Sequence, residues 1–421
     1  MKKLLFIKLC VLLLVSYALC AQKNKAAKEE YISFHWKKSK KTVYIPFDLY
    51  SNLVIIPVVI NNSDTLKFIL DTGVGTTILS DPEVAKQLGL KSVRKIRVNG
   101  VGMGEPINAN IVIDIRMSIG EARANRLSMI YLDTDVLDLS SYVGTKIHGI
   151  IGSDLFQNLV VTVDYLNRKV ELRNTSRYVY RPSKGLKFPI ILMDNKPYIQ
   201  GVKLRNKRQT TSDLLLLDSG AGHAFSIEGQ TGDSTKFHLS PYQFQLGKGL
   251  NGVILGHLGR INQVGLGPWK WNDVVSSFPD SLSYQVKQMQ GASTVSGSIG
   301  GEFLRRFKLT FHYTDNYVVF KPIPSRLNRP FEEGLSGLTI MALSPDFKRF
   351  KVEAVQDGSP ADDVDFRPGD EIWMVNNKKA TEYRLDELNR LLQTKVGDKV
   401  VFLIKRGTEV HLKEITLKRL F

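Results

Sequence analysis

Short apolar runs, separated by turn residues, dominate the chain from Tyr44 onward. Most of these runs are rich in Ile, Val, Leu and Phe or alternate apolar with polar residues, and both patterns favour β-strands. Asn61-Asn62-Ser63-Asp64 is a turn signal between the first two runs. By contrast, the stretch 82–90 begins with Pro and has Gly near its end, which predicts a short helix. The predicted strands of this mainly β lobe lie at 45–60, 66–71, 93–100, 107–120 and 160–172.

The apolar pattern then repeats. Residues 68–80 read FILDTGVGTTILS and residues 214–227 read LLLLDSGAGHAFSI, so each copy places an acidic residue between two apolar runs. The two acidic residues, Asp71 and Asp218, are 147 residues apart. Downstream, 151–173 aligns with 299–321 without a gap at an offset of 148. Such matched spacing indicates two copies of one structural unit.

Glycines strengthen the repeat. An Ile-Gly pair follows each Asp at nearly the same distance and ends at Gly152 in the first copy and at Gly300 in the second. A glycine cluster also follows each Asp by 29 and 31 residues. We therefore predict lobe 1 at 42–180 and lobe 2 at 181–322, with the Trp-rich stretch 268–273 as an insertion in lobe 2. The clustered glycines are Gly100 and Gly102 in the first copy and Gly247 and Gly249 in the second.

Two lobes that each carry Asp-Thr/Ser-Gly, an apolar-Gly segment and a glycine-rich segment between them resemble the retropepsin-like aspartic proteases. Retropepsins are usually homodimers of one such unit, whereas this chain carries two. The resemblance covers roughly residues 42–322. It implies two acid-protease-like β-barrel lobes that form one cleft, and an endopeptidase that acts on polypeptides without a cofactor. An isolated Asp-Thr-Gly is also a common turn, so the interpretation depends on the pairing.

The resemblance implies that Asp71 and Asp218 form the catalytic pair. Two carboxyl groups close enough to share a proton can act as base and acid, because like charges at that separation do not both ionise easily. Thr72 and Ser219 would brace the pair with their hydroxyl groups, and mobile glycine-rich flaps would cover the cleft. Supporting residues in the loops would be Gly73, Gly220, Gly152 and Gly300, and flap residues would be Gly100, Gly102, Met103, Gly247, Gly249 and Leu250.

Other candidate sites are weaker. His223 follows the second motif and could tune the pair, but a histidine here could equally serve packing or lie on the surface. The seven His residues have no metal-binding spacing, so we expect no metal. Ser219 lacks the surroundings of a serine nucleophile. Trp269 and Trp271 could form a partner surface, although packing is the usual role of such a pair.

A third unit follows a predicted linker at 323–333. Residues 334–421 resemble a PDZ domain, a small α+β fold, through Ser359-Pro360-Ala361 and the segment 368–372, PGDEI. PDZ domains bind the C-terminus of a peptide by strand addition, with its carboxylate in a loop of backbone N–H groups. Here that loop would be Ser336-Gly337-Leu338, where Ser336 departs from the usual glycine. The alternative is a domain that packs on the lobes without binding a free terminus.

The N-terminal residues 1–21 read as a signal peptide, with lysines followed by a short apolar run, and 22–41 as a loose lead-in. We therefore expect export, to the periplasm or cell envelope first and secretion second. The only two cysteines, Cys10 and Cys20, lie in the leader. Lipidation at Cys20 is an alternative, although Leu19 before it is bulky.

The chain is basic, with a formal net charge of +17, but its Lys and Arg residues are spread along it and no nucleic-acid module accompanies them. We expect no nucleic-acid partner. The sequence thus predicts an exported aspartic endopeptidase whose PDZ-like domain recruits a polypeptide substrate or a C-terminal peptide ligand. The rival interpretation is a noncatalytic peptide-binding or scaffold protein of the cell envelope that keeps the same cleft.

Overall fold

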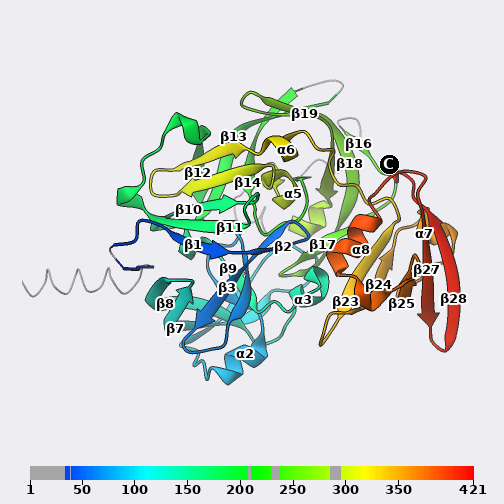
Figure 1. Cartoon of the computed structure of the whole chain (residues 1–421), viewed down its shortest axis with the longest axis horizontal. Helices are drawn as coiled ribbons and strands as arrows, with labels where there is room; N and C mark the ends of the chain where they lie inside the picture. Colours follow the sequence, from blue (N-terminus) through cyan, green and yellow to red (C-terminus); the bar gives the residue numbers. More distant parts are fainter. Residues whose placement is uncertain (1–33, 38, 207–209, 229–236, 285–294) are drawn as a thin grey trace, which may run out of the picture.

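The computed structural model describes residues 34–37, 39–206, 210–228, 237–284 and 295–421. The predicted leader and most of the lead-in, with Cys10 and Cys20, lie outside the described residues. The described part is mainly β, as predicted, and is built from three sheets (Figure 1). Within it, no helix is both long and apolar enough to cross a bilayer.

The first sheet forms the body of lobe 1. Its eight strands run in the order β2-β3-β4-β9-β5-β8-β7-β6, and β3 also pairs with β7. β4 and β9 are parallel, which places the Asp71 motif beside the Ile-Gly pair. The strands are β2 (Asp48–Tyr50), β3 (Leu53–Ile60), β4 (Leu66–Leu70), β5 (Ile78–Leu79), β6 (Arg94–Val98), β7 (Ile107–Ile119), β8 (Ala122–Leu132) and β9 (Gly149–Ile151).

The second sheet begins in lobe 1 and continues through lobe 2. Its main order is β1-β11-β10-β21-β22-β12-β13-β14-β20-β15-β19-β18-β16, with β17 paired to β18. The strands are β1 (Val43–Pro46), β10 (Leu159–Asp164), β11 (Lys169–Asn174), β12 (Leu186–Met193), β13 (Lys196–Arg205), β14 (Thr210–Leu217), β15 (Phe225–Ile227), β16 (His238–Leu239), β17 (Phe244–Gly249), β18 (Gly252–Leu266), β19 (Trp269–Pro279), β20 (Gly297–Ile299), β21 (Phe307–His312) and β22 (Tyr317–Pro322).

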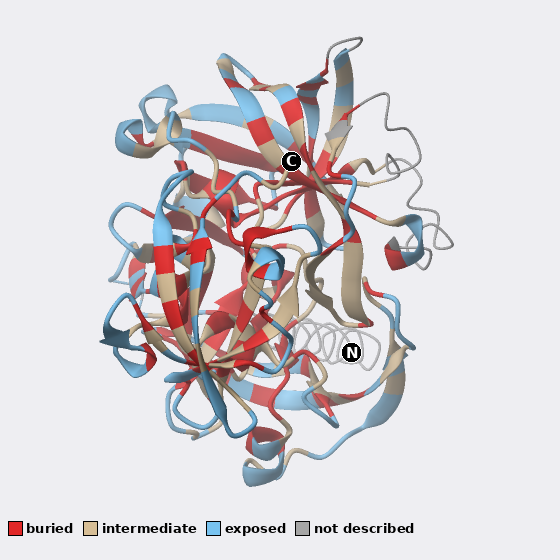
Figure 2. Cartoon of the chain, turned by 90° about the vertical axis from the view of Figure 1, so that its right-hand side faces the viewer, coloured by how far each residue is buried: buried red, intermediate tan, exposed pale blue. Residues whose placement is uncertain are grey.

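The two lobes meet at the antiparallel pair β10–β21. Thr162 lies opposite Thr310, its equivalent 148 residues later, and their Oγ1 atoms are 2.9 Å apart. The flanking hairpins have the same register in both lobes: Val163 pairs with Val170, and Phe311 with Val318. An approximate two-fold axis therefore passes through this threonine pair. One hydrophobic core extends through both lobes, visible as the buried bands along their strands (Figure 2).

The stretch 268–273 is not an insertion. β18 and β19 form a hairpin that corresponds to β7–β8 in lobe 1, and Pro268 lies at its turn. Trp271 is buried, packs edge-on against Phe303 and donates from Nε1 to the carbonyl of Leu327 at 2.8 Å. Both tryptophans therefore serve the core, since Trp269 packs against Phe307.

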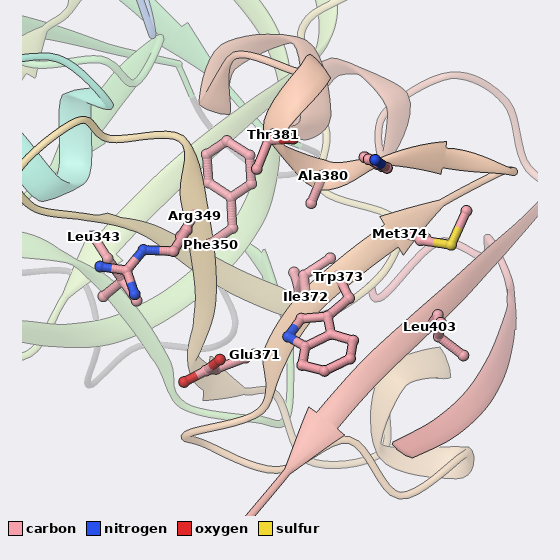
Figure 3. A pocket seen from close by; sticks show the side chains of 11 residues that line it. Leu343, Arg349, Phe350, Glu371, Ile372, Trp373, Met374, Ala380, Thr381 and Leu403 are labelled. Carbon is pink, nitrogen blue, oxygen red and sulfur yellow. The ribbon is translucent and has the colours of Figure 1, made fainter. Parts of the chain in front are cut away.

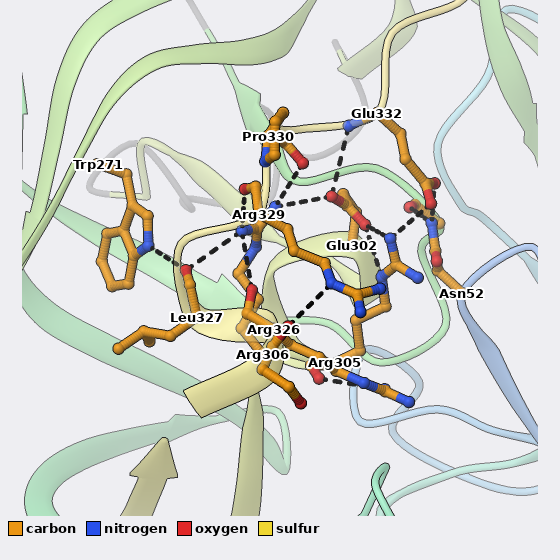
Figure 4. A network of polar contacts seen from close by, with 12 residues as sticks. Asn52, Trp271, Glu302, Arg305, Arg306, Arg326, Leu327, Arg329, Pro330 and Glu332 are labelled. Atoms are coloured by element: carbon orange, nitrogen blue, oxygen red, sulfur yellow. Dashed lines mark hydrogen bonds and ion pairs between the residues drawn. The ribbon is translucent and has the colours of Figure 1, made fainter. Parts of the chain in front are cut away.

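The predicted linker is anchored to lobe 2. It contains α6 (Pro324–Leu327), and the guanidinium of buried Arg306 donates to the carbonyls of Arg329 at 2.6 Å and of Arg326 at 3.4 Å (Figure 4). Glu302 accepts from Arg306 at 2.8 Å and also pairs with Arg305. The remaining lobe helices are α2 (Pro82–Gln87), α3 (Leu139–Val143), α5 (Gly301–Leu304), η1 (Ser153–Leu155), η2 (Thr175–Arg177), η3 (Pro182–Lys184) and η4 (Ser281–Tyr284).

The third sheet belongs to the C-terminal domain. Its order is β23-β24-β25-β27-β28, with β26 on β25, and it encloses a hydrophobic core of its own. β23 is an edge strand and lies beside α8. The elements are β23 (Leu338–Leu343), β24 (Arg349–Val355), α7 (Pro360–Asp363), β25 (Glu371–Val375), β26 (Lys378–Lys379), η5 (Ala380–Glu382), α8 (Leu385–Leu391), β27 (Lys399–Arg406) and β28 (Glu409–Thr416).

Candidate active site

Each acidic motif begins where a buried strand ends. β4 ends before Asp71, whose N–H donates to the carbonyl of Ile151 at 2.9 Å. β14 ends before Asp218, whose N–H donates to the carbonyl of Ile299 at the same distance. In both lobes the partner is the Ile of the Ile-Gly pair. The sequence repeat therefore corresponds to one backbone arrangement used twice.

Thr72 and Ser219 join the two loops through four reciprocal hydrogen bonds. The N–H of Thr72 donates to Ser219 Oγ at 3.1 Å, and the N–H of Ser219 donates to Thr72 Oγ1 at 3.0 Å. Each hydroxyl then donates to the backbone of the other lobe, Thr72 to Leu217 at 2.5 Å and Ser219 to Leu70 at 2.8 Å. Both side chains are buried, so these bonds fix the position of one loop against the other.

Glycine is required next to each Asp because the opposite carboxyl group lies there. A Cβ on Gly220 would be 2.1 Å from Asp71 Cγ, and a Cβ on Gly73 would be 2.8 Å from Asp218 Oδ1. Each glycine also donates its N–H to the Asp of its own lobe, at 2.6 Å from Gly73 to Asp71 and 3.0 Å from Gly220 to Asp218. The structure therefore brings Asp71 and Asp218 together, each carboxyl group over the loop of the other lobe.

The pKa of Asp71 is raised by its surroundings. Burial raises the pKa of Asp71 well above its usual range, and both the charge of Asp218 and a side-chain hydrogen bond to it act in the same direction. The N–H of Gly73 and the charge of Lys196 oppose this shift in the pKa. A carboxyl pair with a raised pKa can hold one proton at a pH where separate aspartates are ionised.

The glycines of the two Ile-Gly pairs lie behind the loops. A Cβ on Gly152 would be 2.6 Å from the carbonyl of Val74, and a Cβ on Gly300 would be 2.3 Å from that of His223. Close passage of the backbone thus explains both residues. The ring of His223 pairs through Nε2 with Ser298 Oγ at 3.0 Å.

Asp154 also supports the first loop, and sequence reasoning did not single it out. Its carboxylate accepts from the N–H of Thr77 at 2.6 Å and from Thr76 Oγ1 at 3.2 Å. Burial raises the pKa of Asp154, although these donors partly offset the shift. The sequence offered one signal for this role of Asp154. It lies three residues after Ile151, in the segment 151–173 that is repeated at 299–321 downstream of Asp218.

The glycine-rich segments form the ends of two hairpins that meet. Segment 99–106, between β6 and β7, is flap 1, and residues 250–251, between β17 and β18, are the tip of flap 2. Asn251 joins them: its N–H donates to the carbonyl of Val101 at 3.1 Å, its Oδ1 accepts from Gly100 at 2.9 Å, and its carbonyl accepts from Gly104 at 2.5 Å. The flaps therefore lie closed against each other, through a residue that the sequence did not indicate.

The predicted flap residues have different surroundings. Leu250 packs against an apolar cluster of lobe 1 and lies where a Cβ on Gly100 would be, 2.5 Å from Leu250 Cβ. Gly102 has φ +130, and its N–H donates to the carbonyl of Ser283 at 3.1 Å. The side chain of Met103 is 48% exposed. Gly249 lies against the carbonyl of Val101, where a Cβ would be 2.1 Å away, and a Cβ on Gly247 would meet nothing within 4 Å.

The predicted carboxylate loop of the PDZ domain is compact. Ser336 is buried, and its Oγ accepts from the N–H of Leu338 at 3.1 Å. Gly337 has φ +81, and a Cβ there would be 2.1 Å from Ser359 Oγ, so only glycine fits. One backbone donor that a peptide carboxylate would use is therefore already bonded within the loop.

A pocket of about 380 Å³ lies elsewhere on the same domain, and all of its lining residues belong to the PDZ unit (Figure 3). Trp373, Met374 and Leu403 line one side, and Arg349 and Glu371 add charge. The ammonium of Lys405 lies 5.5 Å from the centre of the Trp373 ring. This pocket is separate from the aspartate pair. Across the part of the chain that the structure describes, no cluster of three His, Cys, Asp or Glu residues could hold a metal ion.

Two segments of the chain match known protein families. Residues 56–155 match the aspartyl protease family model. This matched range contains the first Asp motif, flap 1 and the first Ile-Gly pair. Residues 351–406 match the PDZ domain model. One segment of lobe 1 thus matches the retropepsin-like aspartyl proteases and one segment of the C-terminal unit matches PDZ domains, which confirms the resemblance inferred from the sequence for these segments. No curated protein matches the chain significantly.

Proposed function

We propose that the protein is an aspartic endopeptidase whose catalytic pair is Asp71 and Asp218, one from each lobe. The observation that carries this proposal is the mutual approach of the two carboxyl groups across Gly73 and Gly220. A cleft that only binds peptides has no use for two carboxyl groups in such close contact, because their repulsion and burial cost free energy. The aspartyl protease match over lobe 1 supports the same conclusion.

The chemistry follows from the shared proton. The ionised carboxylate takes a proton from a water molecule while the resulting hydroxide attacks the peptide carbonyl carbon, and the protonated carboxyl gives its proton to the carbonyl oxygen. The tetrahedral intermediate, a gem-diol, then collapses. The C–N bond breaks, the proton taken from water passes to the leaving nitrogen, and one hydroxyl of the intermediate gives its proton to the other carboxylate as the new C=O forms. The pair again holds one proton. The hydroxyls of Thr72 and Ser219 position the loops and take no proton in this scheme.

Access to the pair requires the flaps to part. Asn251 links flap 2 to the backbone of flap 1 through three hydrogen bonds. A polypeptide that enters would exchange these bonds for bonds to its own extended backbone, which satisfies the same donors and acceptors. The closed flaps would then exclude water from the reacting bond.

The test is cleavage of a random peptide library by the purified protein over a range of pH, beside Asp71→Asn and Asp218→Asn. We expect the wild type to cleave and each single variant to lose at least about 1000-fold in rate, because each removes one of the two proton-transfer roles. Products formed in ¹⁸O-labelled water should carry one label in the new carboxyl group.

The matched control is Asp154→Asn, which keeps an acceptor for Thr77 but lies behind the loop. It should retain most of the activity. If the folded wild type cleaves no peptide under any condition yet binds peptides, the noncatalytic alternative replaces the protease proposal. Equal losses in the control and in the pair variants would also contradict the assignment.

We further propose that the protein acts after export, in the periplasm or cell envelope. The support is the leader-like sequence at residues 1–21, with lysines before an apolar run. The test is the N-terminus of the protein recovered from fractionated cells. A mature N-terminus near residue 21 in the exported fraction supports the proposal, a lipid on Cys20 supports the anchored variant, and an intact Met1 in the cytoplasmic fraction contradicts both.

A further inference from the structure

The peptide-binding groove of the PDZ domain is covered by a helix of lobe 1. PDZ ligands add to the edge strand beside the groove helix, which here are β23 and α8. α3 packs against β23, and the two elements lie side by side in Figure 1. Gly144, which ends α3, lies so close to α8 that a Cβ there would be 2.6 Å from Leu385 Cβ. The groove therefore already holds a segment of the same chain.

Tyr142, next to the last residue of α3, links three parts of the molecule. Its hydroxyl is hydrogen-bonded to the carboxylate of Glu353 on β24 of the PDZ domain. The ammonium of Lys248, on β17 of flap 2, lies 5.8 Å from the centre of the tyrosine ring. A movement of α3 in the groove would therefore change the contact between Tyr142 and flap 2.

The opposite side of α3 packs on the strands that carry the first aspartate. Val143 is buried with Ile55 and Ile69, and Ile69 precedes Asp71 by two residues on β4. Tyr50, on the neighbouring strand β2, adds a second contact with the PDZ domain, since the guanidinium of Arg384 lies 4.1 Å from the centre of its ring. α3 is thus packed between the PDZ groove and the active lobe.

The carboxylate loop fits this internal ligand. The N–H of Leu338 is bonded to Ser336 Oγ, and the N–H of Leu335 donates to the carbonyl of Leu392 at 3.2 Å. An internal helix brings no free carboxylate, so it needs no open set of N–H donors. A competing ligand with a free C-terminus would have to break the Ser336–Leu338 bond as well as displace α3.

We propose that the β23–α8 groove is an intramolecular docking site for α3, and that its occupancy holds flap 2 in the closed position through Tyr142. The partner of the PDZ domain in this state is lobe 1 of the same chain. A polypeptide that takes the groove releases α3 and loosens flap 2. The docking is independent of proteolysis, whereas its effect on cleavage rests on the proposed function.

The test is hydrogen–deuterium exchange on the full chain with Gly144→Ala. The new methyl group meets Leu385 and should separate α3 from the groove, which raises the exchange rates of segments 139–144 and 244–249 by roughly tenfold. The matched control is Gly89→Ala. Gly89 also has a positive φ, +59 against +78, but a Cβ there meets nothing within 4 Å, so it carries the backbone strain without the clash.

Tyr142→Phe tests the docking without adding backbone strain at the end of α3. It keeps the ring and the backbone but removes the hydroxyl that anchors the ring to Glu353. The contact of the ring with Lys248 should then loosen, and exchange in 244–249 should rise roughly threefold. If 244–249 exchanges at the wild-type rate in both Gly144→Ala and Tyr142→Phe, the link to flap 2 is wrong. If Gly89→Ala raises the exchange rate of segment 244–249 as much as Gly144→Ala does, backbone strain explains the effect. That result would contradict the docking proposal.

Peptide cleavage by the same variants tests the consequence. Gly144→Ala and Tyr142→Phe should cleave faster than the wild type and Gly89→Ala, because flap 2 opens more easily. Faster exchange with an unchanged cleavage rate would overturn the regulatory half of the proposal. If no variant cleaves, the protease proposal fails, and the exchange data still decide the docking.

Discussion

Lobes 1 and 2 use equivalent acidic residues for different purposes. Asp154 and Glu302 follow the Ile-Gly pairs at the same place in the repeat, 148 residues apart. Asp154 accepts from Thr76 and Thr77 and so holds the loop that follows Asp71. Glu302 instead pairs with Arg305 and Arg306, which hold the segment leading to the PDZ domain (Figure 4).

The difference shows how a duplicated unit can specialise. The backbone bonds that position the aspartates are the same in both lobes, as are the bonds between Thr72 and Ser219. The acidic side chains that follow the Ile-Gly pairs, Asp154 and Glu302, have different partners in the two lobes. Lobe 2 carries the anchor for a third domain, and lobe 1 contributes the helix α3, which packs against β23 of that domain.

The largest expected effect is that of Glu302→Gln. Arg306 is buried, and loss of its carboxylate partner leaves a buried charge without compensation. We expect a loss of about 3 kcal/mol in the free energy of unfolding. Urea denaturation measures it. Asp154→Asn is the comparison, and it should lose less than about 1 kcal/mol because no ion pair is broken there. Equal losses in the two variants would remove the distinction between the lobes.

A middle-sized effect is expected for Thr72→Val and Ser219→Ala. Each substitution leaves one buried N–H and one carbonyl of the other lobe without a partner. Each should therefore lower the free energy of unfolding by about 2 kcal/mol. The double variant should lose less than the sum, because the two hydroxyls share one network. Additive losses in urea denaturation would mean that the four bonds act separately.

The smallest expected effect is that of Asp71→Asn, which should raise the free energy of unfolding instead of lowering it. The raised pKa of Asp71 means that the folded protein binds a proton more tightly than the unfolded chain, so stability falls as pH rises above the ordinary value of 3.8. Asp71→Asn removes this term and should stabilise the fold by about 1 kcal/mol at neutral pH. The gain should vanish below pH 3.8, where both forms are neutral. A thermal shift that does not depend on pH would contradict the coupling.

The repeat made much of the fold predictable. The offset between the two Asp motifs, carried through the Ile-Gly pairs, reappears in the register that places Thr162 opposite Thr310. The pairing of Asp71 with Asp218 follows from the same symmetry. Trp269 was misplaced in an insertion, although Trp269-Lys270-Trp271-Asn272 alternates apolar with polar residues and begins an ordinary strand of the hairpin.

Contacts that break the symmetry could not be predicted in this way. Asn251 follows a glycine cluster and reads as a turn residue, yet it joins the flaps only because the lobes face each other. α3 reads LSSYV, too short and too polar to show helical periodicity. Its docking depends on the PDZ surface, which has no copy elsewhere in the chain. Met103 lies in flap 1 and is exposed, and the sequence alone does not tell which side of a flap a residue occupies.

The most direct test of the central claim is the titration of the Asp71 carboxyl group, followed by ¹³C NMR in the wild type and in Asp218→Asn. If the two lobes build one proton-sharing pair, Asp71 in the wild type titrates well above 3.8, and its pKa falls when the charge and the hydrogen bond of Asp218 are removed. The same pKa for Asp71 with and without the Asp218 carboxylate would contradict the pair, whatever activity the protein has.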